Sequence, residues 1–128
     1  MSDSRLRPSE RLKRRKAISA LFAHGNSVQV FPLRLVFRLV ERQGRYPAQL
    51  AISVPRKRFK RAVDRNLLKR RMREAYRHNK HTLYAAIPDP SRQLALMIIY
   101  TSDEIQTFDT IERALQRALD LIIHKHLV

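Results

Sequence analysis

The strongest constraint on the fold is the segment 55–80, which is very basic and contains neither glycine nor proline after Pro55. It holds 12 Lys and Arg residues against two acidic residues, a net charge of +10. From Ala62 onward, the apolar side chains fall within one arc of a helical wheel, namely Leu68, Met72, Ala75 and Tyr76. We therefore expect a long helix that docks this apolar stripe on a sheet and leaves a neighbouring basic stripe exposed.

The basic stripe has a spacing that suits a phosphate backbone. Arg65, Lys69, Arg73 and Arg77 recur every four residues and would form a row about 18 Å long. Guanidinium groups bind phosphate oxygens in a bidentate manner, and lysine adds a point charge. Asn66 lies in the same arc and could read a base edge or a ribose hydroxyl. A solvated charged helix with Asn66 simply at its surface is the alternative interpretation.

Charge is distributed unevenly along the chain. Residues 1–80 carry 23 basic and five acidic side chains, a net +18, whereas residues 81–128 carry four and six, a net −2. Repulsion among so many like charges in residues 1–80 indicates a polyanionic partner, either nucleic acid or an anionic membrane. A membrane-surface helix is disfavoured, because the narrow apolar arc is used by the sheet. The absence of cysteine excludes disulfides and thiolate chemistry and favours a cytoplasmic location.

The N-terminal half predicts a short helix followed by strands. Ile18, Leu21 and Phe22 share one helix face, and Gly25 suits the end of that helix. Two strands are expected at Leu33–Val40 and Gln49–Val54, joined as an antiparallel hairpin across Gly44, with a further short strand at Val28–Phe31. Alternation in the first long strand points four residues to a core and three to a basic face; these sets are Leu33, Leu35, Phe37 and Leu39, and Arg34, Val36 and Arg38.

The C-terminal half predicts a connection, a strand and a helix. Residues His81–Gln93 contain two prolines and are expected to form the connection. The continuous apolar run Leu94–Tyr100 indicates a buried strand. Asp109 and Glu112 have the spacing of a capping box. The helix that follows buries one face: Ile111, Leu115, Ala118, Leu119 and Ile122.

These elements predict an α/β fold of the α+β sandwich type, in the order helix–strands–helix–strand–helix around a small mixed sheet. The passage from Gln49 through the basic helix to Tyr100 implies a crossover to a neighbouring parallel strand. We expect a flexible arm at residues 1–8 and a single RNA-binding domain at residues 9–128.

We find no motif for catalysis by the protein itself. The 11 acidic residues are spread thinly, whereas metal-dependent nucleases gather several carboxylates around their cations. Of the five histidines, His124 and His126 are two apart, and residues at that spacing lie on different helix faces. Two glycines cannot build a glycine-rich phosphate loop. We therefore predict no catalytic residue and no protein metal site.

The stretch SVPRKRFKRAVDRNLLKRRMREAYR, Ser53 to Arg77, resembles the signature region of bacterial ribonuclease P protein subunits. Its core is the series Arg65-Asn66, Lys69-Arg70 and Arg73-Glu74. The N-terminal stretch RLKRRKAISALFAHGNSV is similar to the opening of that family, with a basic run, a short helix and a turn glycine. The resemblance extends from about Arg11 to Leu121.

The resemblance implies a small subunit of a ribonucleoprotein that removes the 5′ leader from precursor tRNA. In this family the RNA subunit performs the hydrolysis with bound Mg²⁺, and the protein holds the leader in a cleft between its first helix and one sheet face. The basic helix faces the catalytic RNA. The family fold also implies a left-handed crossover, against the usual rule. The implied partners are therefore the catalytic RNA and the precursor leader, with no membrane and no DNA.

The resemblance also assigns site residues. Contacts with the catalytic RNA are expected from Arg61, Arg65, Asn66, Lys69, Arg70, Arg73 and Arg77. Contacts with the leader are expected from Lys13, Arg14, Ile18, Phe22, Arg34, Val36, Arg38, Arg56 and Lys57, although Phe22 could equally be core, and Arg34 and Arg38 could simply solvate the sheet.

Two positions depart from the family pattern. Leu67 stands where a third basic residue often follows Arg-Asn, and Ile18 stands where an aromatic is usual, which removes one platform for base stacking.

Composition alone also allows other functions. A ribosome-like structural RNA-binding protein with no role in a processing enzyme would carry the same charge. A DNA-binding basic helix is a weaker alternative. Cleavage assays with the catalytic RNA separate the first alternative from the processing subunit, and competition by duplex DNA tests the second.

Overall fold

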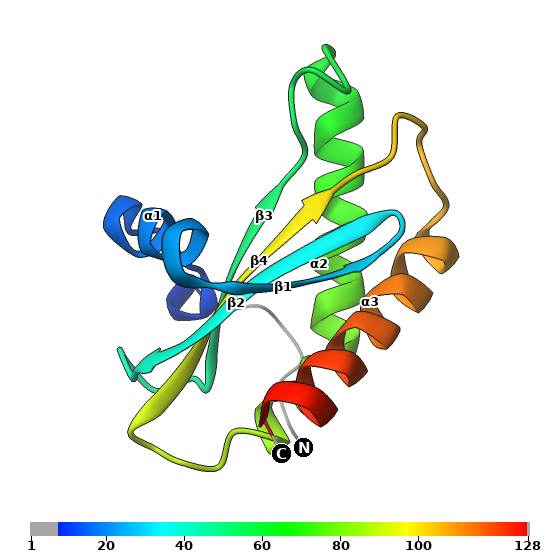
Figure 1. The fold of residues 1–128 in the computed structure, drawn as a ribbon. Coiled ribbons are helices and arrows are strands. Elements are labelled where there is room, and N and C mark those ends of the chain that lie inside the picture. The colour runs from blue at the N-terminus through cyan, green and yellow to red at the C-terminus, as the bar shows by residue number, and fades with distance from the viewer. Residues whose placement is uncertain (1–7, 128) are drawn as a thin grey trace.

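The computed structural model describes residues 8–127 and has the predicted order of elements (Figure 1). After a 3-10 turn at Pro8–Glu10, the elements are α1 (Arg15–His24), β1 (Asn26–Val30), β2 (Leu33–Glu41), β3 (Ala48–Ser53), α2 (Ala62–Ala85), β4 (Arg92–Tyr100) and α3 (Phe108–Ile122), followed by a π-helical turn at Ile123–Leu127. The predicted arm at residues 1–8 lies outside the described residues except for Pro8. None of the described helices is long and apolar enough to cross a membrane.

The four strands form one sheet in the order β1-β2-β4-β3. Strand β4 lies between β2, which it pairs antiparallel, and β3, which it pairs parallel. The predicted hairpin across Gly44 is therefore wrong, because β2 and β3 are not neighbours. The apolar run of β4 needs partners at both edges and cover on both faces, so it takes the centre of the sheet. The observed hairpin joins β1 to β2.

The parallel pairing of β3 with β4 confirms the predicted crossover. In Figure 1 the ribbons of β3 and β4 both run upward and cross in this view, and α2, which joins them, lies behind the sheet. Helix α2 packs in the larger core and α1 on the smaller one, so the crossover places the basic helix on the face of the sheet opposite to α1. The left-handed course of this crossover, against the usual rule, stays what the resemblance implies.

Each face of the sheet has its own core. The larger core packs α2 and α3 on Leu35, Phe37 and Leu96, which are at most 2% exposed. The smaller core packs α1 and Leu12 on Val36, Ala95 and Met97. The predicted apolar face of β2 is thus confirmed, but the opposite face is only partly basic, because α1 covers its centre.

Two helix boundaries differ from the sequence expectation. Helix α2 continues through His81 to Ala85, because Leu83 still packs in the larger core and is fully buried. Helix α3 begins one residue before Asp109, and its cap is Thr107, whose hydroxyl accepts from the Thr110 amide. The predicted Asp109 cap is therefore wrong, whereas the buried face of α3 is confirmed.

The two glycines serve different purposes. Gly25 ends α1 with its amide on the Leu21 carbonyl at 2.8 Å, and an added Cβ would lie 2.4 Å from that oxygen. Gly44 has a φ of +94°, a conformation that favours glycine, in the loop that joins β2 to β3. Glycine is required at position 25 because the Leu21 carbonyl approaches it closely, and at position 44 because of the positive φ angle.

Candidate nucleic-acid interface

Helix α2 exposes basic side chains on the flank that faces the N-terminal segment and α1. Its apolar arc is buried as predicted: Leu68, Met72, Ala75 and Tyr76 have no exposed surface. Next to this arc, Lys69 and Arg73 are partly buried, and Asn66 and Arg70 are exposed. The helix therefore docks on the sheet and still presents cations beside it.

The two ends of the predicted phosphate row are already engaged within the protein. The Nη1 atom of Arg65 donates to the carbonyls of Phe59 and Lys60, both at 2.8 Å. The Arg77 guanidinium donates to both carboxylate oxygens of Glu74. This hydrogen bond lowers the pKa of Glu74 and raises the pKa of Arg77. The row is therefore split, and Lys69 and Arg73 form its open middle.

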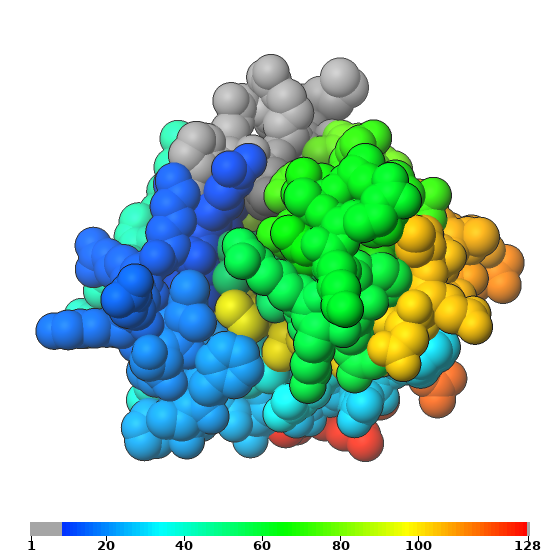
Figure 2. All heavy atoms as spheres, turned by 90° about the horizontal axis from the view of Figure 1, so that it is seen from above, coloured from blue at the N-terminus to red at the C-terminus, as the bar shows by residue number. Residues whose placement is uncertain are grey.

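Lys69 and Arg73 line a hollow that we call the α2 groove, with a volume of about 430 Å³. Arg11 and Lys13 line it from the N-terminal segment. Its remaining lining is apolar: Leu12, Ile18, Leu50, Ala51, Ile52 and Met97. Figure 2 shows the groove from above, between the N-terminal segment and α1 (blue) and α2 (green).

Charge in the α2 groove is of one sign. Cations from two distant segments meet there, and none of the residues described around it is acidic. Like charges in a hollow with apolar walls repel one another and raise the local concentration of anions. The groove is thus suited to a phosphate group.

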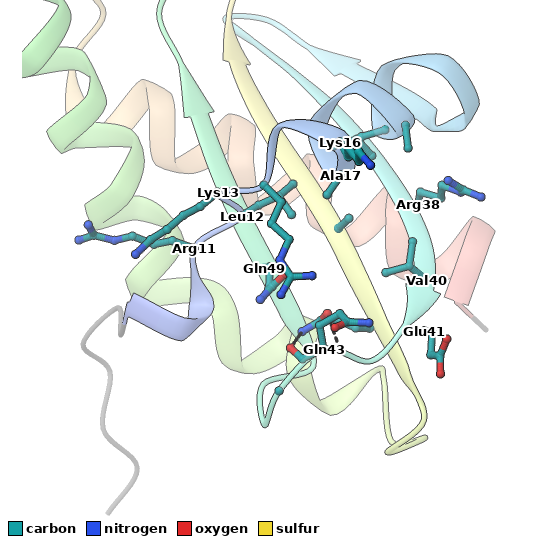
Figure 3. Close-up of a pocket in the computed structure, with 16 residues that line it drawn as sticks. Arg11, Leu12, Lys13, Lys16, Ala17, Arg38, Val40, Glu41, Gln43 and Gln49 are labelled. Carbon is teal, nitrogen blue, oxygen red and sulfur yellow. Dashed lines mark hydrogen bonds between the residues drawn. The ribbon is translucent and has the colours of Figure 1, made fainter.

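A second hollow, the α1 cleft, lies between α1 and the sheet and has a volume of about 630 Å³. Its floor and one wall are apolar, from Leu12, Ala17, Ala20, Leu21, Val40 and Ala95. The cations around it are Arg11, Lys13, Arg14, Lys16 and Arg38, and Glu41 is the only acid among its described lining residues. In Figure 3, Arg11 and Lys13 extend toward α2, and Arg38 extends outward from β2.

Three glutamines at one end of the α1 cleft were not predicted as site residues. Gln43, Gln49 and Gln93 all line it. The side chain of Gln93 is buried, donates to the carbonyls of Gln43 and Tyr46, and accepts from the Gln43 amide. It therefore holds the β2–β3 loop against the cleft. Period-two alternation in β3 could have placed Gln49 on the face of Ala51, but no local signal identifies Gln93.

The structure gathers some of the predicted leader residues and separates others. Lys13, Arg14 and Arg38 line the α1 cleft, and Ile18 lines the α2 groove. Phe22, which could have been core, is 52% exposed on α1. Three other predicted leader residues lie on the surface outside the lining of both hollows: Arg34 on β2, and Arg56 and Lys57 in the loop before α2. Arg61, predicted to contact the catalytic RNA, also lies outside both linings, at the cap of α2.

Val36 is the exception among these residues. It is 3% exposed and packs beneath α1 in the smaller core. The prediction of a leader contact assumed that the whole Arg34–Val36–Arg38 face of β2 is open. Because α1 covers the middle of that face, the Val36 side chain has almost no surface to offer a ligand.

Neither hollow offers the ligands of a resident magnesium ion. Mg²⁺ prefers oxygen ligands in octahedral geometry, chiefly carboxylates and water. Among the described lining residues, the α1 cleft has a single carboxylate and the α2 groove has none. Throughout residues 8–127, no group of three or more His, Cys, Asp or Glu side chains is placed to hold a metal.

Comparison with known proteins identifies close relatives. The family described as Ribonuclease P matches residues 6–122. The chain is 41% identical over 114 residues to the ribonuclease P protein component of Porphyromonas gingivalis, covering 89% of this chain and 83% of that one. It is 31% identical to the corresponding component of Chlorobaculum tepidum over 122 residues, covering 88% and 79%. The solved RNase P protein from Thermotoga maritima superposes with a TM-score of 0.66 at 30% identity, covering 86% of this chain and 94% of that one.

Proposed function

We propose, from the premise that the chain belongs to the ribonuclease P protein family, that it binds a catalytic RNA subunit and the 5′ leader of precursor tRNA. In this proposal the protein promotes removal of the leader. Composition also allows a ribosome-like protein outside any processing enzyme, but family membership does not support that alternative. We also propose a cytoplasmic location, because the chain has no cysteine and suits a reducing compartment.

The observation that carries the proposal is the convergence of cations around two hollows that share one segment. Arg11, Leu12 and Lys13 line both the α1 cleft and the α2 groove. A single-stranded leader in the cleft and a folded RNA against α2 would therefore meet the same two cations from opposite sides. Arginine and lysine in such places neutralise backbone phosphates without reading sequence.

We assign the α2 side to the catalytic RNA. Lys69 and Arg73 would bind phosphate in the groove, and Arg70 and Asn66 would contact RNA at the exposed surface. Arg61 lies at the start of the helix and extends this surface. Arg65 and Arg77 would act mainly by fixing the loop and the helix around these contacts, because their guanidinium groups already bind protein oxygens.

We assign the α1 side to the leader. A single strand is bound without sequence preference by cations along its backbone and aromatic rings beneath its bases. Lys13, Arg14 and Arg38 would supply the cations in the cleft. Phe22 is the exposed ring of α1 and would supply one stacking surface.

We further propose that water cleaves the phosphodiester bond at the RNA subunit, which would hold most of the Mg²⁺ needed for the reaction. The ion would activate the attacking water and stabilise the leaving oxygen. This chain's residues would bind and orient the leader and lower the repulsion between two RNA molecules. The scarcity of carboxylates around the described hollows supports this division of tasks.

Reconstitution tests the proposal. The chain is mixed with the catalytic RNA at low Mg²⁺, and kcat/KM is measured for precursor tRNA with a leader and with the leader cut to one nucleotide. We expect the protein to favour the long leader, and binding to fall with salt with a log–log slope of about −4 or steeper if at least about six phosphates are contacted. Equal effects on both substrates would favour the ribosome-like alternative, and cleavage by RNA-free protein would refute the assignment of catalysis to RNA.

A further inference from the structure

A buried carboxylate ties the N-terminal segment to α2. Glu10 has no exposed surface, and its oxygens accept from Lys80 Nζ at 2.8 and 3.1 Å and from the Tyr84 hydroxyl. Lys80 is itself 2% exposed. Burial raises the pKa of Tyr84, so its hydroxyl keeps the proton that it donates. A charged pair is retained in such a place only when its hydrogen bonds are made.

Lys80 lies on the flank of α2 that carries Lys69 and Arg73. It follows Arg73 by seven residues and Lys69 by eleven, which is close to two and three turns of helix. The flank therefore continues from the groove to the buried site. At this last position the cation binds a carboxylate of the protein itself.

The residues that follow Glu10 are held on the edge of the sheet. The Leu12 amide donates to the Leu50 carbonyl at 2.7 Å, and Arg11 forms a parallel bridge with Leu50 on β3. Leu12 is buried under α1 in the smaller core. The Gln49 side chain donates to the Ser9 carbonyl at 3.2 Å. Glu10 thus begins the strand-like segment that separates the α1 cleft from the α2 groove.

We propose that Glu10 is a positioning residue for the leader. Its bonds to Lys80 and Tyr84 set the path of residues 11–13, and this path brings Arg11 and Lys13 to both hollows. The inference rests on the proposed function, because it assigns the consequence of this anchor to leader binding. The physical reason is preorganisation: a segment ordered during folding does not have to be ordered when the ligand binds.

A purely structural role makes a different prediction. If the buried pair only adds to global stability, its loss weakens every activity of the protein to the same extent. If it positions the segment, leader binding falls more than binding to the catalytic RNA, because Lys69, Arg70 and Arg73 are carried by α2 itself. The ratio of the two affinities therefore distinguishes the two roles.

Three variants and one control test the inference in the reconstituted complex. Glu10→Ala removes the anchor, and Tyr84→Phe removes only the phenol donor. Glu10→Gln retains one oxygen that can accept from Lys80 and Tyr84, but its amide nitrogen cannot accept the second hydrogen bond from Lys80. Glu104→Ala is the matched control, because Glu104 is an exposed carboxylate in the loop between β4 and α3. The control separates positioning from the general effect of one more unit of positive charge.

The leader advantage is measured as the ratio of dissociation constants for mature tRNA and precursor tRNA. If the competent path is populated about one fifth of the time in Glu10→Ala, precursor affinity falls about fivefold. Affinity for the catalytic RNA should fall less than precursor affinity, because only Arg11 and Lys13 of its expected contacts belong to the repositioned segment, whereas Lys69 and Arg73 stay on α2. The leader advantage of Tyr84→Phe and of Glu10→Gln should lie between that of Glu10→Ala and that of the wild type. The leader advantage of Glu104→Ala should equal that of the wild type.

Hydrogen exchange of the Leu12 amide in the protein without RNA provides a second readout. We expect protection of this amide to be lost in Glu10→Ala and reduced in Tyr84→Phe. If Glu10→Ala does not fold, the result for Tyr84→Phe alone tests whether the anchor orders the segment. An unchanged leader advantage, a parallel loss of both affinities or unchanged protection would each overturn the inference. A wild-type protein without any leader advantage would instead overturn the proposed function.

Discussion

The two flanks of α2 carry similar side chains and have opposite surroundings. On the flank toward α3, Arg71 donates to the Gln106 carbonyl, and His78 and Asn79 both contact Glu112. On the flank toward α1, Lys69 and Arg73 line a groove that has no acidic residue among its described lining. The difference teaches that the number of cations on a helix does not say which of them bind a ligand; the neighbouring elements decide.

Lys80 and Lys69 give the largest contrast, because both are lysines on the flank toward α1. Lys80→Ala leaves the Glu10 carboxylate buried without its cation and should lower the free energy of unfolding by about 3–5 kcal/mol. Lys69→Ala removes a partly exposed side chain and should change stability by less than about 0.5 kcal/mol. Urea unfolding of both variants measures this. Equal losses would show that the two positions have the same structural role.

The next largest effect separates the two flanks by RNA affinity. Lys69→Ala and Arg73→Ala should each weaken binding to the catalytic RNA and reduce the slope of the salt dependence by about 1. Arg71→Ala is the matched control: it removes a hydrogen bond to Gln106 and should cost about 1–3 kcal/mol of stability while the salt slope is unchanged. Filter binding at several salt concentrations tests the comparison, which fails if Arg71→Ala also reduces the slope.

Two exposed aromatic side chains allow a similar comparison for leader binding on the α1 side. Phe22 and Phe31 are 52% and 65% exposed, on α1 and on the β1–β2 turn. Phe22→Ala should weaken leader binding by about 1–3 kcal/mol if one base stacks on the ring, whereas Phe31→Ala should have no effect on it. Titration of fluorescent precursor tRNA measures both variants, and identical results would remove Phe22 from the leader site.

The smallest effect concerns pH. The hydrogen bond from Arg77 holds the pKa of Glu74 below its usual value of 4.5. Because the folded state binds the proton less readily, the pair stabilises the fold above pH 4.5, and this contribution disappears as the pH falls through the lowered pKa. The difference in urea midpoint between the wild type and Glu74→Gln should therefore be small at pH 7 and vanish in acid. A difference that persists at low pH would assign it to another cause.

Periodicity predicted much of this molecule correctly. The buried arc of α2, the buried face of α3 and the apolar face of β2 were all placed from spacing alone. These features follow from the geometry of one element and from the gain on removing its apolar side from water. The resemblance of Ser53–Arg77 to a known family predicted membership, which the comparisons confirm.

The errors arose where two distant segments meet. The hairpin across Gly44 was expected because neighbours in sequence often pair, yet β4 enters between β2 and β3. The exposure of Val36 was expected from alternation, yet α1 covers it. For these two features no local pattern states which distant segment is near. The row of four cations stays a prediction; Arg65 and Arg77 at its ends bind oxygens close by in the chain, and the i,i+3 spacing of Glu74 and Arg77 could have indicated that pair.

The amino-acid sequence by itself determined the elements, their buried faces and the strongly cationic character of the first 80 residues. Only the tertiary structure decided that Arg11 and Lys13 meet Lys69 and Arg73 in one groove, and that Lys80, on the same flank of α2, is buried against Glu10. The reason is physical: helix and strand patterns depend on contacts within a few residues, whereas the state of a charge depends on what the whole fold packs against it.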